Sequence, residues 1–455
     1  MLLGRRARGM ELGLLVLAVL ISGIGQVAQS IGRSNALDPG VWRSSVALLL
    51  LALAGHGAVR VWAPAADPVL LPLAVMLCGL GLAEIARIDG GPQGGSYAPR
   101  QLVWVALGVG AFAVTLWRLP DHRALASYGY TCGLAGLVLL ALPAVLPASI
   151  SEVNGARAWI RISGFSIQPG EIAKLLLMVF FASYLVAKQE TLSVVNRSVL
   201  GLPLPRARDL GPVLVAWAAS MVILVTENEI GFPLILFGLF LAMLFVATQR
   251  FSWVLIGLVL FAAGVAGADA TVGHVHQRFV IWLDAFNPAY VSGSSYQLVQ
   301  GLYAMAGGGL FGTGLGRGHP DLVPFARTDF VVAAIGEELG LVGLFVVLTL
   351  YAVLVARGLS AGLRVRDSFG KLFAAGLSVS LVIQVFVVVG GVTRLIPLTG
   401  ITTPFVSYGG SSVIANFVVI ALLLRISTAA RSPAPPLAAL PEPGATRLVQ
   451  LLGPR

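Results

Sequence analysis

The sequence predicts an all-α integral membrane protein, a polytopic bundle of about twelve transmembrane helices. Hydrophobic residues make up 57% of the 455 residues and charged residues only 11%, whereas soluble domains carry roughly 25% charged residues. The mean hydropathy is +0.90, so most of the surface must face lipid. Backbone groups inside a bilayer have to be satisfied internally, which leaves helices or closed barrels. The long apolar runs show no alternating strands, and this argues against a barrel.

Twelve apolar runs are expected to form the transmembrane helices, because a spanning helix needs about 20 apolar residues. The first run is long and a second follows closely, so we expect a retained helix and not a cleaved signal peptide. In chain order, the runs cover residues 11–31, 44–63, 68–87, 101–117, 127–148, 171–187, 211–226, 230–248, 252–272, 330–356, 372–392 and 403–425.

Lysines and arginines lie in alternate loops, and this asymmetry predicts the orientation. They precede the first run, separate the sixth from the seventh and the tenth from the eleventh, and follow the last. With an even number of helices all these segments lie on the cytoplasmic side, so we expect both termini there. The formal charge of +10 is explained by these loops and the anionic leaflet beside them. We therefore expect no nucleic-acid partner.

Two loops on the outer side are long, over 149–170 and 273–329. Long loops in compact proteins are usually functional or disordered. The second carries several aromatic residues, among them Trp282 and Tyr303, which indicates an ordered segment. We therefore place any chemistry in this loop.

Ionisable residues at membrane depth are expensive and are candidates for function. Glu171 and Lys174 open the sixth helix at i,i+3 spacing, so they lie on one face and can pair; a purely structural ion pair is the alternative. Glu337 and Glu338 lie about two turns into the tenth helix, after Asp329 at its mouth. Adjacent helical residues point about 100° apart, so we expect one glutamate to face the interior.

The second outer loop also holds residues suited to phosphate. Arg278, Arg317 and Arg327 carry the planar fork that matches phosphate oxygens. The segment 307–318 is glycine-rich, and bare amides can approach a phosphate closely. It is not a Walker loop, since the Gly-Lys-Ser/Thr ending is missing, and a plain hinge is the alternative.

Short motifs follow one another in an order that resembles the SEDS family, the shape, elongation, division and sporulation proteins. The resemblance covers about residues 68–425, and its last block is closer to the RodA than to the FtsW branch. The motifs are Asn154-Gly-Ala-Arg-Ala-Trp-Ile160, Gln168-Pro-Gly-Glu-Ile-Ala-Lys174, Tyr296-Gln297, the glycine cluster at 307–318, Thr328-Asp329-Phe330, Gly336-Glu-Glu-Leu-Gly340, Pro397-Leu-Thr-Gly400, Thr403-Pro-Phe405 and Ser407-Tyr-Gly-Gly-Ser-Ser412.

The chain departs from the family pattern at several positions. Gly170 stands where the family usually has Ser, Arg327 where it often has His, and Arg394 where Gly is common. Glu229 takes the place of an Asp in a short turn with Glu227, where solvated loop acids are the alternative interpretation. These changes bear on efficiency or substrate and not on the fold.

The family resemblance also predicts how the chain is divided. The family has about ten helices, so residues 1–66 are expected to be an extra N-terminal helix pair that contains no motif and is dispensable for chemistry. The core is expected over 67–426, with the outer loop 273–329. The tail 427–455 is rich in Pro and Ala and is expected to be a disordered cytoplasmic segment.

The resemblance implies a peptidoglycan glycosyltransferase that polymerises lipid II into glycan strands at the outer face of the cytoplasmic membrane, for cell shape, elongation or division. It implies an inverting transfer with undecaprenyl pyrophosphate as leaving group. Asp329 matches the family's proposed catalytic acidic residue and would accept the proton of the acceptor hydroxyl. We expect the helix N-terminus and Arg327 to favour its ionised form.

The resemblance implies further participants. A divalent cation, Mg²⁺ or Mn²⁺, is expected to assist, and a class B penicillin-binding protein, a transpeptidase, is the expected partner together with other divisome or elongasome membrane proteins. A lipid II flippase and a non-catalytic scaffold that recruits the transpeptidase are the rival functions. The candidate substrate-binding residues are Arg278, Gln297, Arg317, Arg327, Lys174, Glu171, Glu337, Glu338, Ser407 and Ser411.

Overall fold

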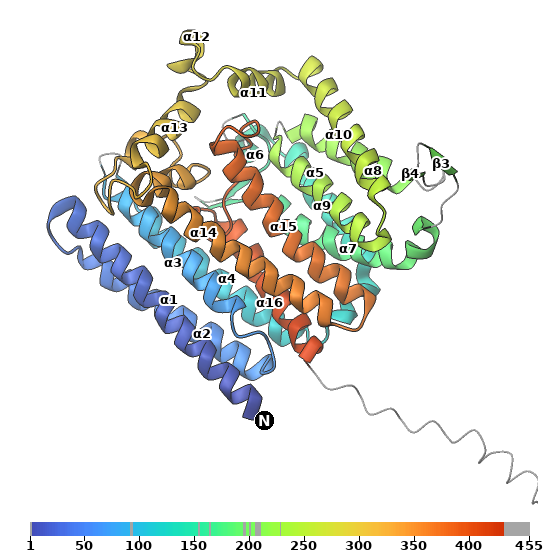
Figure 1. The fold of residues 1–455 in the computed structure, drawn as a ribbon, viewed down its shortest axis with the longest axis horizontal. Coiled ribbons are helices and arrows are strands. Elements are labelled where there is room, and N and C mark those ends of the chain that lie inside the picture. Colours follow the sequence, from blue (N-terminus) through green and yellow to red (C-terminus); the bar gives the residue numbers. More distant parts are fainter. Residues whose placement is uncertain are drawn as a thin grey trace, which may run out of the picture.

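The computed structural model describes residues 2–91, 94–152, 155–162, 165–193, 197–199, 202–204, 211–227 and 229–431. It confirms a polytopic helical bundle (Figure 1). Within these ranges, eleven helices are long and apolar enough to cross a membrane. They are α1 (Leu2–Ser34), α2 (Pro39–Trp62), α3 (Leu70–Asp89), α4 (Tyr97–Arg118), α5 (Gly129–Val145, which continues the 3-10 turn His122–Tyr128), α7 (Pro169–Ser193), α9 (Gly231–Thr248), α10 (Phe251–Thr271), α14 (Val331–Arg364), α15 (Ser368–Val392) and α16 (Gly410–Arg431).

The seventh expected run, 211–226, forms α8 (Gly211–Glu227), a helix of 17 residues. That length is at the lower end of what spans the hydrocarbon, so eleven candidate spans and this shorter helix stand where twelve spans were expected. The last helix also ends later than expected. Since α16 continues to Arg431, the tail expected from 427 begins with five helical residues, and 432–455 lie outside the described residues.

Both predicted outer loops contain ordered structure. The first holds α6 (Ala148–Ser151) and a hairpin of β1 (Ile160–Ile162) with β2 (Phe165–Ile167), paired so that Ile160 faces Ile167. The second holds α11 (Gly273–Leu283), α12 (Pro288–Val291), α13 (Tyr296–Gly308) and a 3-10 turn at Pro320–Leu322. A second small hairpin, β3 (Arg197–Val199) with β4 (Leu202–Leu204), follows α7.

The N-terminal pair lies along one edge of the bundle (Figure 1). Helix α1 contacts α3, and α2 contacts α4. At the opposite end of the bundle from the N-terminus, α11, α12 and α13 lie together above the spanning helices (Figure 1). The candidate loop is therefore a helical cap over one end of the bundle.

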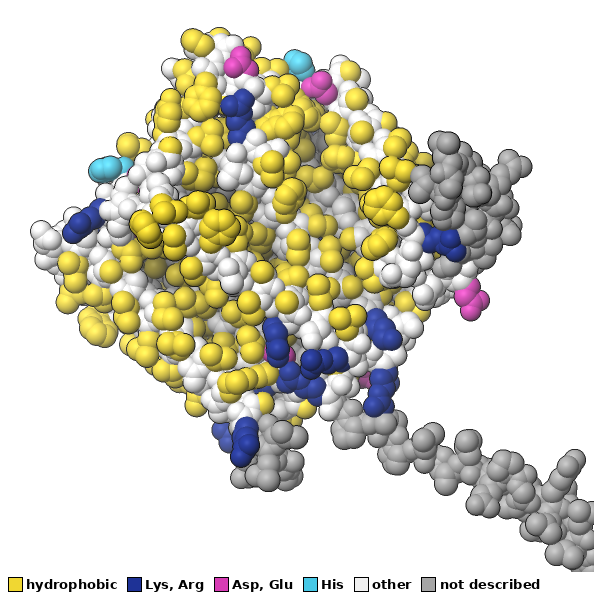
Figure 2. Space-filling view, in the orientation of Figure 1, with side chains coloured by type: hydrophobic (Ala, Val, Ile, Leu, Met, Phe, Trp, Pro, Cys, Tyr) yellow, Lys and Arg dark blue, Asp and Glu magenta, His cyan; other side chains and the backbone are white. Residues whose placement is uncertain are grey.

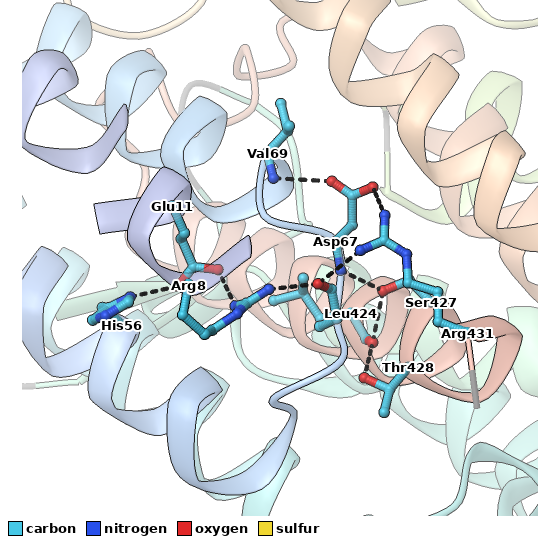
Figure 3. A network of polar contacts seen from close by, with 10 residues as sticks. Arg8, Glu11, His56, Asp67, Val69, Leu424, Ser427, Thr428 and Arg431 are labelled. Atoms are coloured by element: carbon cyan, nitrogen blue, oxygen red, sulfur yellow. Dashed lines mark hydrogen bonds and ion pairs between the residues drawn. The ribbon is translucent and has the colours of Figure 1, made fainter. Parts of the chain in front are cut away.

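Asp67 joins three helices at the end where the N-terminus lies. Its carboxylate forms ion pairs with Arg431, at 2.8 Å, and with Arg357. Its backbone N–H donates to the hydroxyl of Ser427 at 2.9 Å. The loop before α3 and the end of α16 are thus held together (Figure 3), and Arg357 joins α14 to them.

The same end fastens the N-terminal pair to the core (Figure 3). Arg8 pairs with Glu11, and Glu11 contacts His56 of α2 at 2.7 Å. Arg8 also donates to the carbonyl of Ala66 at 2.5 Å. The same carbonyl accepts from Arg431 of α16 at 3.0 Å. Lys and Arg side chains gather at this end, whereas hydrophobic side chains cover the middle of the face in view (Figure 2).

Helix α14 bends at Gly340, whose φ of 67° and ψ of −167° are not helical. A Cβ at this position would lie 2.3 Å from the backbone nitrogen of Gly312. Only glycine accepts both this backbone region and this close approach. The bend therefore fits the glycine-rich segment against α14, directly behind the stretch that carries Asp329.

Candidate functional site

A cavity of about 730 Å³ lies at the capped end of the bundle. Helices α11 and α13 and the start of α4 form part of its walls. The rest comes from the β1–β2 hairpin, from the turn before α9, and from the segments that precede α14 and α16. The lining residues are Arg100, Trp104, Ala156, Trp159, Ser166, Glu229, Ile230, His274, Arg278, Gln297, Phe325, Thr328, Asp329, Leu398, Thr399, Gly400, Thr402, Tyr408, Gly409 and Gly410.

Asp329 is the predicted catalytic residue, and it lines this cavity. One carboxylate oxygen accepts from the amide of Gln297 at 3.2 Å, and the other accepts from the hydroxyl of Thr328 at 2.8 Å. The structure thus brings together two of the predicted site residues, Asp329 and Gln297. Both donors are neutral, so they orient the carboxylate without cancelling its charge.

The expectation that Arg327 favours ionised Asp329 is wrong. Arg327 turns away: its guanidinium pairs with Asp89 at 3.3 Å, donates to the carbonyl of Gly94 at 2.7 Å and lies 4.7 Å from the centre of the Tyr97 ring. Helix α14 starts after Phe330, and Asp329 does not cap it. Burial, the largest cause, raises the pKa of Asp329 above its usual value. A carboxylate with a raised pKa is a better proton acceptor near neutral pH.

Arg278 is a charged neighbour of Asp329, and its positive charge makes the smallest of the contributions that oppose the raised pKa of Asp329. Burial lowers the pKa of the Arg278 guanidinium, and the carboxylates of Asp329 and Glu229 oppose that shift. Its side chain donates to the carbonyl of Leu398 at 3.2 Å, which fixes it in the cavity wall. Of the three arginines expected to face phosphate, Arg278 alone lines this cavity.

Glu229, one of the departures from the family pattern, also lines the cavity. Burial raises the pKa of Glu229 to about 7, and the nearby Glu171 adds to the shift. The amide of Gln168 lies 3.4 Å from both carboxylate oxygens. The solvated-acid interpretation of this residue is therefore wrong, because its carboxylate is buried.

Glu171 and Lys174 pair as predicted, with 2.8 Å between Lys174 Nζ and a Glu171 oxygen. Gln384 of α15 completes the cluster: its amide oxygen accepts from Lys174 at 2.8 Å, and its nitrogen donates to Glu171 at 3.3 Å and to the carbonyl of Thr402 at 3.0 Å. The pair is fully buried behind the cavity wall. It therefore supports Thr402 and does not itself face the cavity.

Ser407 and Ser411 also hold backbone and do not face the cavity. The Ser407 hydroxyl donates to the carbonyl of Thr328 and accepts from the backbone N–H of Thr403 at 2.8 Å. Ser411 accepts from the backbone N–H of Gln168 at 3.0 Å. These two hydroxyls thus fix the segments that carry Asp329 and the start of α7.

Glu337 and Glu338 lie in α14 behind the glycine-rich segment and not at the cavity. The backbone N–H of Gly316 donates to the Glu338 carboxylate at 2.9 Å, and that of His319 donates to Glu337 at 2.8 Å. The N–H of Gly314 donates to the carbonyl of Glu338 at 3.1 Å. The expectation that these glycine amides meet a phosphate is therefore not met.

Arg317 is exposed at the surface of the same segment. A plain hinge is not what the structure shows either, because backbone amides of this segment donate hydrogen bonds to Glu337 and Glu338 of α14. Its neighbour on the other side of Gly318, His319, is equally exposed. The glycine-rich stretch serves as a close-fitting layer between α14 and the rest of the cap.

Sequence reasoning did not select Arg100, and it considered His274 only with His276 and His319 as a metal site, whose spacing matches no zinc pattern. Arg100 lies one residue before the expected run 101–117 and belongs to none of the family motifs, whereas Asp329 was selected by its motif. His274 lies four residues before Arg278 on α11, so both project from one helix face into the cavity. That spacing becomes informative only once the loop is known to be helical there.

Comparison with known proteins decides the family. The model of the FTSW_RODA_SPOVE cell cycle proteins matches residues 69–432. The chain belongs to this family. The match begins after α2, and the family motifs Thr328-Asp329-Phe330 and Pro397–Gly400 contribute side chains to the cavity.

Curated FtsW/RodA/SpoVE proteins resemble the chain over most of its length. Peptidoglycan glycosyltransferase RodA of Mycobacterium tuberculosis H37Rv is 51% identical over 431 residues, 94% of this chain and 92% of the relative. The protein of the same name from Mycobacterium leprae is 51% identical over 383 residues, 83% of this chain and 81% of the relative. Stage V sporulation protein E of Bacillus subtilis is 32% identical over 338 residues, 74% of this chain and 88% of the relative.

Solved structures share the fold. A chain of a peptidoglycan synthase complex that coordinates polymerization and crosslinking superposes with a TM-score of 0.64 at 27% identity, covering 80% of this chain and 97% of its own. The rod shape determining protein RodA of Thermus thermophilus gives 0.56 at 26% identity, covering 80% and 96%. The division into an extra pair (1–66), a core (67–426) and a tail (427–455) stays a prediction.

Proposed function

We propose that the chain is a peptidoglycan glycosyltransferase that polymerises lipid II into glycan strands for cell shape. The observation that carries this proposal is the cavity in which Asp329 and Arg278 face one space. The family supports the enzyme class, as do the mycobacterial relatives named for that activity. The cavity lies at the capped end, where a lipid-linked sugar can enter from the surface of the bilayer.

The proposed chemistry is a single in-line displacement that inverts the sugar. The acceptor is the 4-hydroxyl of one lipid II, and the leaving group is the undecaprenyl pyrophosphate of another. Asp329 accepts the hydroxyl proton as the new glycosidic bond forms and the bond to pyrophosphate breaks. Arg278 offsets the charge on the departing pyrophosphate. Neutral donors from Gln297 and Thr328 hold the base in place.

A divalent cation, Mg²⁺ or Mn²⁺, is the proposed cofactor. Mg²⁺ is commonly held by one or two carboxylates together with substrate phosphates and water. Among the described residues, no group of three His, Cys, Asp or Glu side chains is placed to hold a metal ion. Glu229 is the cavity carboxylate that fits this limited role, with pyrophosphate supplying the other oxygens. Bound there, the ion would neutralise charge on the leaving group.

The proposed orientation puts both termini in the cytoplasm and Asp329 outside. Arg357 of α14 pairs with Asp67 at the arginine-rich end, beside Arg431 of α16. Asp329 precedes the other end of α14. The 27 intervening residues span roughly 40 Å at about 1.5 Å each, more than the hydrocarbon of about 30 Å. The positive-inside rule then places the Asp67 end in the cytoplasm.

A class B penicillin-binding protein is the proposed partner, with other divisome or elongasome membrane proteins. The support is the similarity to a chain of a peptidoglycan synthase complex that coordinates polymerization and crosslinking. Glycan strands made at the outer face need a transpeptidase to crosslink them. Nothing in the proposed chemistry requires a nucleic acid.

The flippase alternative loses support from the structure. A path for lipid II through the bundle would need accessible charges at membrane depth, and the candidates are Lys174 with Glu171 and the Glu337–Glu338 pair. Lys174 and Glu171 are instead closed off by Gln384, and Glu338 by Arg87 at 2.9 Å. Charged side chains that already have fixed partners inside the protein are poorly suited to bind the headgroup of lipid II during transport.

The test is polymerisation of detergent-solubilised lipid II by the purified protein, where no membrane exists to flip across. We expect wild type to make glycan strands and Asp329→Asn to make them at least about a hundredfold more slowly, the scale of a lost general base. Asp284→Asn, an exposed acid in the same cap, is the control and should behave as wild type. Equal rates for Asp329→Asn and wild type would rule out Asp329 as the general base. Wild-type protein that makes no glycan strands would rule out the proposed polymerase activity.

A second test removes the cation. We expect EDTA to abolish polymerisation by wild type and added Mg²⁺ or Mn²⁺ to restore it, because the pyrophosphate charge is then left to Arg278 alone. Synthesis that continues at full rate in EDTA would dismiss the cation.

A further inference from the structure

The carboxyl end of α1 lies in backbone contact with the glycine-rich segment. A Cβ on Gly32 would lie 2.2 Å from the carbonyl oxygen of Leu315. A Cβ on Gly316 would lie 2.2 Å from the carbonyl oxygen of Gln29. Contacts under 3.0 Å leave no room for a side chain on either partner, so the two backbones fit against each other through paired glycines.

Side-chain contacts extend this junction into the core. The Gln29 amide donates to Glu84 of α3 at 3.2 Å. One turn further along α3, Arg87 pairs with Glu338 at 2.9 Å, and the same carboxylate accepts from the N–H of Gly316 at 2.9 Å. All three of these ionic side chains are buried. Helix α1 thus contacts the glycine-rich segment directly, and through Gln29 it also contacts Glu84 of α3. Glu84 lies one turn from Arg87, which pairs with the glutamate that binds Gly316.

A second set of contacts leads from α1 toward the residue next to the base. The guanidinium of Arg33 lies directly over Gly90, at the end of α3. Just beside it, the carbonyls of Ile88 and Gly94 accept from Arg327, at 3.3 and 2.7 Å. The end of α3 is therefore held by α1 on one side and holds the Asp329 segment on the other.

The two residues before Asp329 also have backbone partners in the segment that precedes α16. The carbonyl of Arg327 accepts from the N–H of Tyr408 at 2.7 Å. The carbonyl of Thr328 accepts from Ser407. Each residue adjoining the carboxylate thus has a fixed partner, so a movement of Arg327 moves Asp329.

We propose that Gly32 and Gln29 of α1 are positioning residues for the base Asp329, acting through the glycine-rich segment and the end of α3. The proposal rests on the proposed function, since it assumes that Asp329 acts in glycan polymerisation. Helix α1 lies before residue 69, where the family match begins, so this support is an addition to the family core. It also opposes the expectation that residues 1–66 are dispensable, which was based on the absence of motifs and did not consider contacts.

The experiment compares two glycine substitutions in α1 within the full-length protein. Gly32→Ala places a methyl group against Leu315, whereas Gly25→Ala meets no atom within 4 Å and is the matched control. We expect Gly32→Ala to lower kcat roughly ten- to a hundredfold, the scale of a displaced catalytic group. KM should stay within about twofold of the control, and kcat should stay low at temperatures where both proteins are fully folded, although the clash with Leu315 lowers the melting temperature.

Gln29→Leu is the second variant, because it breaks the hydrogen bond to Glu84 without adding bulk toward Leu315. We expect a smaller fall in kcat with the same unchanged KM. Wild-type kcat in both variants would overturn the proposal, and so would a kcat that returns to the control value wherever the variant is fully folded. In either case wild type and Gly25→Ala still polymerise lipid II, whereas a failure of the proposed function would leave all four proteins inactive.

Discussion

Glu171 and Lys174 form a buried ion pair whose charges are balanced within one small cluster. Both side chains are almost completely buried, and Gln384 bonds to each of them. Removing one partner leaves an uncompensated charge in a low-dielectric interior, which is strongly destabilising. The i,i+3 spacing predicted this pair from sequence, but not Gln384, which comes from a helix about 210 residues later.

The first prediction concerns this pair. We expect Lys174→Met and Glu171→Leu each to lower stability by about 3–5 kcal/mol, seen as a lower melting temperature in detergent. The reversed pair, Glu171→Lys with Lys174→Glu, should recover part of the loss. Lys188→Met, an exposed lysine on the same helix, serves as control. Single variants as stable as Lys188→Met would show that the charges do not depend on each other.

The neighbourhood of Asp329 shows what sequence proximity cannot supply. Arg327 lies two residues from Asp329 but its side chain turns to Asp89, whereas Arg278, about 50 residues earlier, acts on the carboxylate. The position of Asp329 was predictable from its motif at the mouth of a helix. Its partners were not, because side-chain direction depends on how α3, α11 and α14 meet.

At the level of elements, α14 owes its shape to a contact made far along the chain. The apolar run 330–356 predicted the helix but not the bend at Gly340. That bend exists because the backbone of Leu310 and Gly312 lies against Gly340, so that a Cβ there would be 2.6 Å from the Leu310 carbonyl oxygen. Helix ends were also misjudged: α14 continues to Arg364, because an apolar run marks only the part of a helix that lies in lipid.

The second prediction follows from the bend. Gly340→Ala must hold a side chain in a backbone region that is essentially restricted to glycine, at a cost of about 1–3 kcal/mol, and must push the glycine-rich segment away. We expect a lower melting temperature together with slower polymerisation. Gly307→Ala in α13 meets no atom within 4 Å and should be neutral or slightly stabilising, since alanine favours helix. A Gly340→Ala protein that matches Gly307→Ala would indicate that the bend is free to relax.

For the whole molecule, composition and hydropathy were sufficient to predict the fold class, the membrane location and all eleven candidate spans of the described residues, with one further expected run that forms the shorter helix α8. They succeed because lipid imposes the same demand on every crossing segment. The cap was harder: 273–329 was expected to be ordered, but its three helices are short, and they are fixed by contacts with the bundle beneath. The cavity depends on this cap, so its outline could not be derived from local sequence.

The last prediction is the membrane orientation, on which the whole mechanism depends, since lipid II must meet Asp329 at the outer face. Single cysteines report it in intact cells, in a background where Cys132 is replaced by Ser while Cys78 stays buried. Asp284→Cys, exposed in the cap, should react with a membrane-impermeant maleimide. Arg366→Cys, exposed between α14 and α15, should react only after the membrane is opened. The reverse pattern would put Asp329 in the cytoplasm, and the cavity would then face the wrong side for building a cell wall.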